Sequence, residues 1–120
     1  MLAVVLSYGL IGIEGFEVRA EVNLSPGLAQ LELVGLPDAA VKEAKERVRA
    51  ACENSGFPFP DAALTVNLAP ADRRKEGSAF DVALLMGLLR SGGYIHSDVS
   101  FEDKCFVGEL SLSGELRGVR

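Results

Sequence analysis

The residues best suited to chemistry lie together in one short segment, Asp72-Arg73-Arg74-Lys75-Glu76. Three consecutive cations can bind a phosphate, a neighbouring subunit or another domain, and arginine is suited to bidentate contacts with anions. The flanking Asp72 and Glu76 partly neutralise these cations, so the segment can equally be a solvated loop. We treat the five residues as a candidate interaction loop and keep both interpretations open.

Ser78 follows this loop and precedes the apolar run Ala79–Leu89. A serine at the start of a helix commonly caps it, because its side-chain oxygen accepts a hydrogen bond from a free amide of the first turn. The sequence therefore predicts that Ser78 caps a helix. A role as a nucleophile is the alternative.

Few residues have the types and spacing of a metal site. The chain has one histidine, His96, and two cysteines, Cys52 and Cys105, which are far apart. This arrangement supports neither a disulfide framework nor a zinc site. We expect reduced, partly buried thiols and a surface histidine, and we expect carboxylates such as Glu109 to be surface charge.

Nucleotide-binding motifs are also missing from the sequence. Gly9, Gly12 and Gly15 lack the spacing of a dinucleotide fingerprint and lie between two strand-like segments, so we interpret them as turn glycines. No GxxxxGK[ST] segment occurs in the 120 residues. We therefore expect neither a cofactor nor a P-loop in this chain.

The elements that must position these residues begin with three strand-like segments, Leu2–Tyr8, Phe16–Leu24 and Ala29–Val34. The second alternates apolar and charged residues, which is typical of a half-buried strand. Glycine-containing breaks separate the three segments, and we predict a three-stranded antiparallel meander.

Two helices and further strands are expected after the meander. Apolar residues recur at three- and four-residue steps over Asp38–Ser55, with Asp38 beside the first-turn amides, which predicts an amphipathic helix. Ala63–Leu68 is strand-like, Ala79–Leu89 predicts a helix buried on most sides, and Phe106–Leu116 predicts a hairpin. The order indicates an α+β fold: a two-layer sandwich in which two helices cover a mostly antiparallel sheet.

Size and charge limit the possible functions. A chain of 120 residues with 48% hydrophobic residues fits one domain with a single core, which we assign to residues 1–120. The net charge of −5 opposes non-specific nucleic-acid binding, which depends on neutralising phosphates. We find no segment long enough to span a membrane, and we expect a soluble, cytoplasmic protein.

Three stretches carry a recognisable pattern: VGLPDAAVKE (residues 34–43), TVNLAPADRRKEG (65–77) and FVGELSLSG (106–114). Together they resemble the N-terminal domain of Mg-chelatase-like AAA+ ATPases of the ComM/YifB family. The resemblance implies the fold of the Lon peptidase domain and of a ribosomal-protein domain. It also implies an AAA+ ATPase domain after residue 120, so we expect a chain truncated at its C-terminus.

The same resemblance raises the question of Lon-like proteolysis. In Lon-type peptidases a Gly-Pro-Ser-Ala-Gly-like segment supplies the nucleophilic serine, which a lysine activates. When the corresponding stretch is aligned on Gly77, Ala79 stands where the family has its serine. The lysine that the family places after the last hairpin would lie beyond Arg120. We therefore expect no peptidase activity from this chain.

The resemblance implies a non-catalytic accessory domain of a hexameric, ATP-driven motor that moves branched DNA in natural transformation. The full-length protein would use ATP and Mg²⁺. The partners of this domain would be its own AAA+ module and neighbouring subunits, with DNA contacted through other domains. The alternatives are a degenerate Lon-like Ser/Lys peptidase, and a stand-alone nucleic-acid-binding module that uses Arg73, Arg74 and Lys75.

Overall fold

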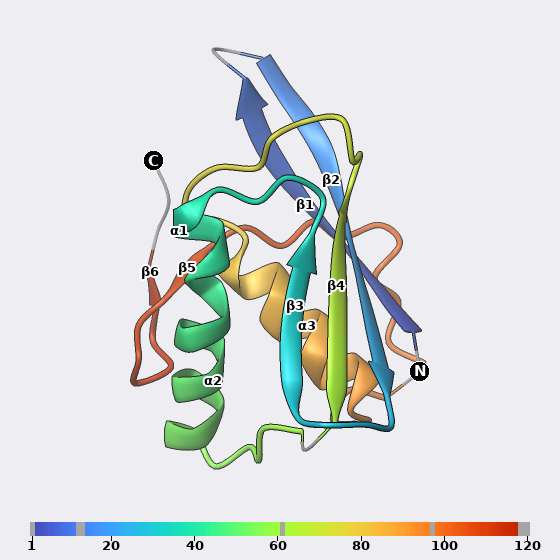
Figure 1. The fold of residues 1–120 in the computed structure, drawn as a ribbon, viewed down its shortest axis with the longest axis vertical. Coiled ribbons are helices and arrows are strands. Elements are labelled where there is room, and N and C mark those ends of the chain that lie inside the picture. The colour runs from blue at the N-terminus through green and yellow to red at the C-terminus, as the bar shows by residue number, and fades with distance from the viewer. Residues whose placement is uncertain (1, 12–13, 61, 97, 118–120) are drawn as a thin grey trace.

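The computed structural model describes residues 2–11, 14–60, 62–96 and 98–117. A four-stranded sheet forms one layer and helices form the other (Figure 1). The strands of this sheet are β1 (Leu2–Ile11), β2 (Glu14–Ser25), β3 (Gln30–Val34) and β4 (Ala63–Ala69). The helices are α1 (Ala39–Lys42), α2 (Ala44–Asn54) and α3 (Asp81–Ser91). The predicted α+β class and two-layer arrangement are confirmed.

The strand order β1-β2-β4-β3 differs from the predicted meander. β2 pairs antiparallel with β1 and β4, whereas β3 pairs only with β4, in parallel. The meander was wrong because α1 and α2 carry the chain from the end of β3 back to the start of β4, and such a crossover makes the two strands parallel. β4 thereby takes a central position, where Leu64, Val66 and Leu68 are all buried.

One face of the sheet carries the core. The apolar residues of β2 and β4 pack against both α2 and α3 in a single cluster, which also contains Phe80 and Leu110. The residues that alternate with them, such as Glu17, Arg19 and Thr65, are exposed on the opposite face. The period-two pattern in the sequence thus predicted correctly which face of β2 and of β4 is buried.

The predicted helix over residues 38–55 is present as α1 and α2, with Glu43 between them. Asp38 caps α1 with a hydrogen bond of 2.7 Å from the backbone N–H of Val41 to its carboxylate. Ser55 is the C-cap of α2, and Gly56 follows with a φ of 83°. The cap and the end expected from the sequence are both confirmed.

The apolar helix α3 begins two residues later than predicted, and Ser78 does not cap it. Phe80 occupies the N-cap position, and no side chain makes a capping hydrogen bond there. The backbone carbonyl of Ser78 instead accepts a hydrogen bond of 3.3 Å from the N–H of Asp81. Phe80 is buried in the core at this position, with 1% of its surface exposed, and the helix begins at the next residue.

The glycine-rich connection between the first two strands is mostly strand. Gly9 pairs with Phe16 and Gly15 pairs with Leu10 in the β1–β2 ladder. A Cβ on Gly9 would lie 2.7 Å from the ring of Phe16, so the glycine makes room for an aromatic side chain. The turn interpretation was therefore wrong for Gly9 and Gly15, while Gly12 lies outside the described residues.

A short hairpin, β5 (Glu109–Leu110) and β6 (Leu116–Arg117), ends the described chain. It forms a separate two-stranded sheet beside α2 and α3 (Figure 1). The predicted hairpin is confirmed, although its strands are shorter than expected. Phe106 lies before it and donates its backbone N–H to the carbonyl of Leu6 in β1, at 2.8 Å.

Candidate functional site

The charged loop is fixed to the segment that leads into α1. Two backbone hydrogen bonds join them, from the N–H of Lys75 to the carbonyl of Leu36 (3.0 Å) and from the N–H of Asp38 to the carbonyl of Lys75 (2.9 Å). The carboxylate of Asp38 also accepts a hydrogen bond of 3.2 Å from the N–H of Gly77. Asp38 therefore caps the helix and holds the loop at the same time.

Lys75 is not a surface residue, although it belongs to the candidate interaction loop. Its side chain is fully buried, and its Nζ donates hydrogen bonds to the carbonyl oxygens of Gly35 (2.7 Å) and Pro70. Burial lowers the pKa of the Lys75 amine below its usual value. In this structure Lys75 joins the loop to the end of β3 and cannot reach an external partner.

Gly35 makes this arrangement possible. Its φ is 103°, which is in the left-handed region, and a Cβ at this position would lie 2.2 Å from the carbonyl oxygen of Leu68. Only glycine avoids both the strain and the clash. The close approach of the segment after β3 to β4 brings the Gly35 carbonyl within reach of Lys75.

The other four residues of the loop remain accessible. Arg73 lies over the ring of Phe16, with 5.2 Å from its Cζ to the ring centroid. Arg74 pairs with Glu76 at 3.6 Å, and Asp72 is exposed. Ion pairs between exposed side chains contribute at most about 1 kcal/mol, so these residues could exchange partners. Their role in binding remains a prediction.

A buried ion pair lies between α2 and α3. Arg47 donates two hydrogen bonds to the carboxylate of Asp81, from Nε at 2.6 Å and from Nη2 at 3.0 Å. Asp81 is fully buried and also accepts a hydrogen bond of 3.0 Å from the N–H of Leu110. Arg47 donates a further hydrogen bond to the carbonyl of Ala40. These contacts join both helices to β5.

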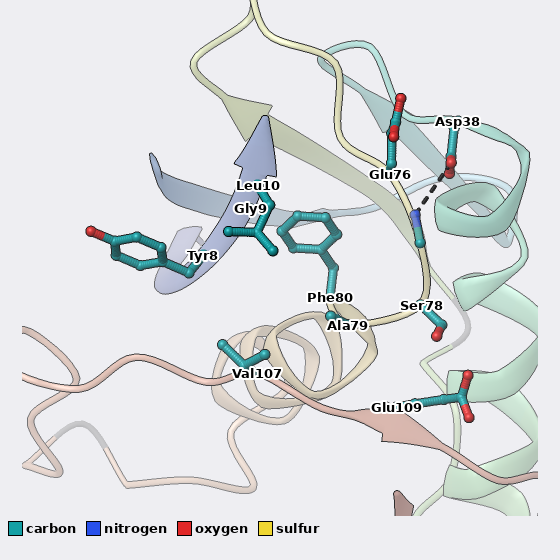
Figure 2. Close-up of a pocket in the computed structure, with 11 residues that line it drawn as sticks. Tyr8, Gly9, Leu10, Asp38, Glu76, Ser78, Ala79, Phe80, Val107 and Glu109 are labelled. Atoms are coloured by element: carbon teal, nitrogen blue, oxygen red, sulfur yellow. Dashed lines mark hydrogen bonds between the residues drawn. The ribbon is translucent and has the colours of Figure 1, made fainter. Parts of the chain in front are cut away.

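A hollow lies at the start of α3, whose first residue is Asp81 of this ion pair (Figure 2). Residues 8–10 of β1 form one wall and residues 76–80 form another, and Asp38, Val107 and Glu109 complete the lining. The buried ion pair, the Asp38 hydrogen bonds and the Lys75 contacts all hold the segments that surround it. The hollow is therefore a pre-formed feature of the fold.

Ser78 and Glu109 lie near each other at one side of this hollow, as Figure 2 shows. A hydrogen bond from the Ser78 hydroxyl holds the pKa of the Glu109 carboxyl below its usual value, and Arg117, at 3.7 Å, acts in the same direction. Glu109 was expected to be surface charge alone, without this partner. Because a carboxylate of lowered pKa is a weaker base, the pair is poorly suited to activating the serine.

The other residues of chemical interest lie apart from the hollow. The side chain of His96 is 75% exposed, as expected for a surface histidine. Both cysteines are free thiols; Cys52 is buried, whereas Cys105 is exposed, so the expectation of partial burial was wrong for Cys105. Within the described ranges, no cluster of three His, Cys, Asp or Glu side chains is placed to hold a metal ion. None of the described helices is long and apolar enough for a membrane span.

Comparisons with known proteins place the chain in a family. The family described as subunit ChlI of Mg-chelatase matches residues 20–120. The chain is 45% identical over 120 residues to the competence protein ComM of Haemophilus influenzae. It is 43% and 41% identical over 118 residues to the uncharacterized proteins YifB of Salmonella typhimurium and Escherichia coli. The chain therefore belongs to the ChlI family, and its resemblance to ComM and YifB is confirmed.

The extent of these matches is uneven. They cover 98% of this chain but only 23% of each of these three relatives. The chain thus spans less than a quarter of the length of these relatives.

Proposed function

We propose that this chain is a non-catalytic accessory domain of a Mg-chelatase-like ATPase of the ComM and YifB type. The observation that carries the proposal is the hollow at the start of α3, whose described lining lacks the groups of a Ser/Lys hydrolytic site. Ala79 stands where a Lon-like peptidase would have its nucleophile. Neither lysine nor histidine is among the described residues that line the hollow.

The contacts around the hollow support a structural and docking role. Asp38, Lys75 and Arg47 are each engaged in hydrogen bonds that hold one segment to another. A lysine that donates to two carbonyls and an arginine that donates to a carboxylate are not free to act as a base or to bind a phosphate. These side chains therefore make the domain rigid, which suits the transmission of force or position between attached modules.

In the proposed setting, the domain precedes an AAA+ module that binds ATP and Mg²⁺, and the assembly is a cytoplasmic hexamer. The partners of the domain are that module and the neighbouring subunits. The accessible part of the charged loop, Arg73 and Arg74 with Asp72 and Glu76, is the proposed contact. The motor would act on branched DNA, which its other domains would bind.

The test uses this 120-residue chain and a longer protein that contains it. The chain alone should not hydrolyse ATP, whereas the longer protein should do so with Mg²⁺ present. A double charge reversal, Arg73→Glu with Arg74→Glu, should lower the ATPase rate or the hexamer fraction of the longer protein, while Lys104→Glu, a distant exposed lysine, should not. A longer protein that assembles and hydrolyses ATP equally well without residues 1–120 would refute the accessory role.

Two alternatives make different predictions. A degenerate peptidase would cleave casein, and Ser78→Ala would abolish the cleavage; unchanged cleavage in that variant would exclude Ser78 as the nucleophile. A nucleic-acid-binding module would bind branched DNA with an affinity that falls steeply with salt. The burial of Lys75 and the position of Arg73 over Phe16 disfavour the second alternative, because two of its three proposed cations already have contacts within the domain.

A further inference from the structure

The strand β3 is at the edge of the sheet and has one open side. It pairs with β4 alone, so the backbone N–H and C=O groups on its other side have no ladder partner among the described residues. In Figure 1, β3 lies next to α2, on the side of the sheet away from β1. Such an edge can accept one more strand from another chain.

A groove runs between this edge and the helices. It is lined by Leu31, Glu32 and Leu33 of β3 and by Lys42 and Lys45 of the helical segment. Leu31 and Leu33 pack against the core but remain only partly buried, and β4 is the one strand of the described residues that pairs with theirs. The groove thus combines a half-exposed apolar floor with an open backbone edge.

A row of cations follows the same groove. Lys42, Lys45 and Arg49 are three and four residues apart, which places them on one side of the helical segment. All three are exposed. Arg49 lies over the ring of Phe59, at 4.8 Å, in a separate hollow that also includes Glu53 and Ala29, the residue before β3. This row stands out on a chain whose net charge is −5.

We propose that the β3 edge binds an extended acidic segment of a partner polypeptide, which adds to the sheet as a fifth strand beside α1 and α2. Its backbone would form the ladder with β3. On the face it would share with Leu31 and Leu33, which is the side of the helices, its carboxylates would contact Lys42 and Lys45, and its intervening side chains would lie on the face of Glu32. This inference does not depend on the proposed role in an ATPase, because the groove shares no lining residue with the hollow at α3 and includes no residue of the charged loop.

The geometry favours a peptide over a nucleic acid. Glu32 lines the groove and would repel a backbone that carries a phosphate at every nucleotide. A peptide strand directs successive side chains to opposite faces, so it can place carboxylates by the lysines and keep them away from Glu32. An open β edge also matches the hydrogen-bonding pattern of an extended peptide backbone.

The test measures binding of a fluorescein-labelled decapeptide, (Glu-Val)₅, by fluorescence anisotropy at low and physiological salt. (Lys-Val)₅ and a (Glu-Val)₅ in which alternate amides are N-methylated serve as control peptides. The variant Lys42→Glu/Lys45→Glu should weaken binding about tenfold, whereas Lys104→Glu, a single charge reversal elsewhere, should leave it unchanged. Amide NMR spectra should show the largest shifts in residues 29–34 and along the helix side that carries Lys42.

Three results would overturn the proposal. The first is that (Glu-Val)₅ does not bind saturably, which would mean that Lys42 and Lys45 serve only to keep the β3 edge from pairing with other chains. The second is equal binding of the N-methylated peptide, which would exclude a β ladder. The third is tighter binding of a single-stranded DNA oligonucleotide, abolished by the same double variant. Because Lys42 and Lys45 are exposed, the double variant should keep its fold, and circular dichroism would verify this.

Discussion

The buried ion pair between Arg47 and Asp81 is the contact whose removal should have the largest effect on this domain. Replacing Arg47 with methionine keeps the length and the apolar stem of the side chain but removes its charge. The carboxylate of Asp81, which is fully buried, would then retain only the backbone N–H of Leu110 as a hydrogen-bond donor among the contacts described above.

The expected magnitude follows from this geometry. Breaking a buried pair by removing one partner costs about 3–5 kcal/mol, because an uncompensated charge is left in the interior. The Arg47 side chain is 19% exposed, so some solvent relief is available and the lower half of that range is expected. With a urea m-value of about 1.5 kcal/mol/M, the unfolding midpoint should fall by roughly 2 M.

The assay is urea denaturation followed by circular dichroism at neutral pH. Arg49→Met on the same helix is the matched control, since Arg49 is exposed and should cost less than about 1 kcal/mol. The double variant Arg47→Met/Asp81→Asn should recover part of the loss, because the asparagine is neutral and its oxygen can still accept from Leu110. The reasoning is refuted if Arg47→Met is no worse than Arg49→Met, or if the double variant loses more than the single one.

Three further predictions concern a glycine, the thiols and a carboxylate. Gly35→Ala should destabilise the fold by several kcal/mol, because its Cβ would meet a backbone carbonyl at 2.2 Å. Gly77→Ala should cost only about 1 kcal/mol, because Gly77 also has a positive φ but has nothing within 4 Å of the added Cβ. Thermal melts of both variants would check this difference. In native protein, iodoacetamide followed by mass spectrometry should modify the exposed Cys105 first and the buried Cys52 only on unfolding, and equal rates would contradict the structure. Because the pKa of Glu109 is lowered in the folded protein, ionised Glu109 stabilises the fold above pH 4.5, the usual pKa of a glutamate, and this stabilisation is lost as the pH falls through the lowered pKa. The urea midpoints of the wild type and of Glu109→Gln should therefore approach each other as the pH is lowered.

Local sequence patterns predicted most of the elements of this fold. The cap at Asp38, the helix that follows it, the alternation in β2 and β4, and the hairpin at the end are all present. Each depends on residues within a few positions of one another, so the sequence contains the whole signal. The order of strands depends instead on which surfaces pack together. For that reason the position of β4 between β2 and β3 did not follow from the pattern of β3 alone.

The candidate site was only partly predictable. The charged loop is where the sequence placed it, but Lys75 turned inward while Arg73 and Arg74 stayed outside. Its partners are carbonyls of Gly35 and Pro70, and nothing in the sequence pairs a lysine with a carbonyl 40 residues away. The Arg47–Asp81 pair was missed for the same reason. An aspartate in the first turn of an otherwise apolar helix was the one available signal, since a buried carboxylate requires a partner.

The sequence by itself determined the class of fold and the position of most helices and strands, because these follow from periodicity and caps that act over short distances, and three of its stretches carried the resemblance to the family. Only the tertiary structure decided which charged residues are available to a partner. Lys75 is buried and Arg47 half-buried in contacts with distant segments, while Lys42 and Lys45 remain exposed beside an open strand. The cost of burying a charge is met only where hydrogen-bond partners converge from several elements, and that convergence exists only in the folded chain.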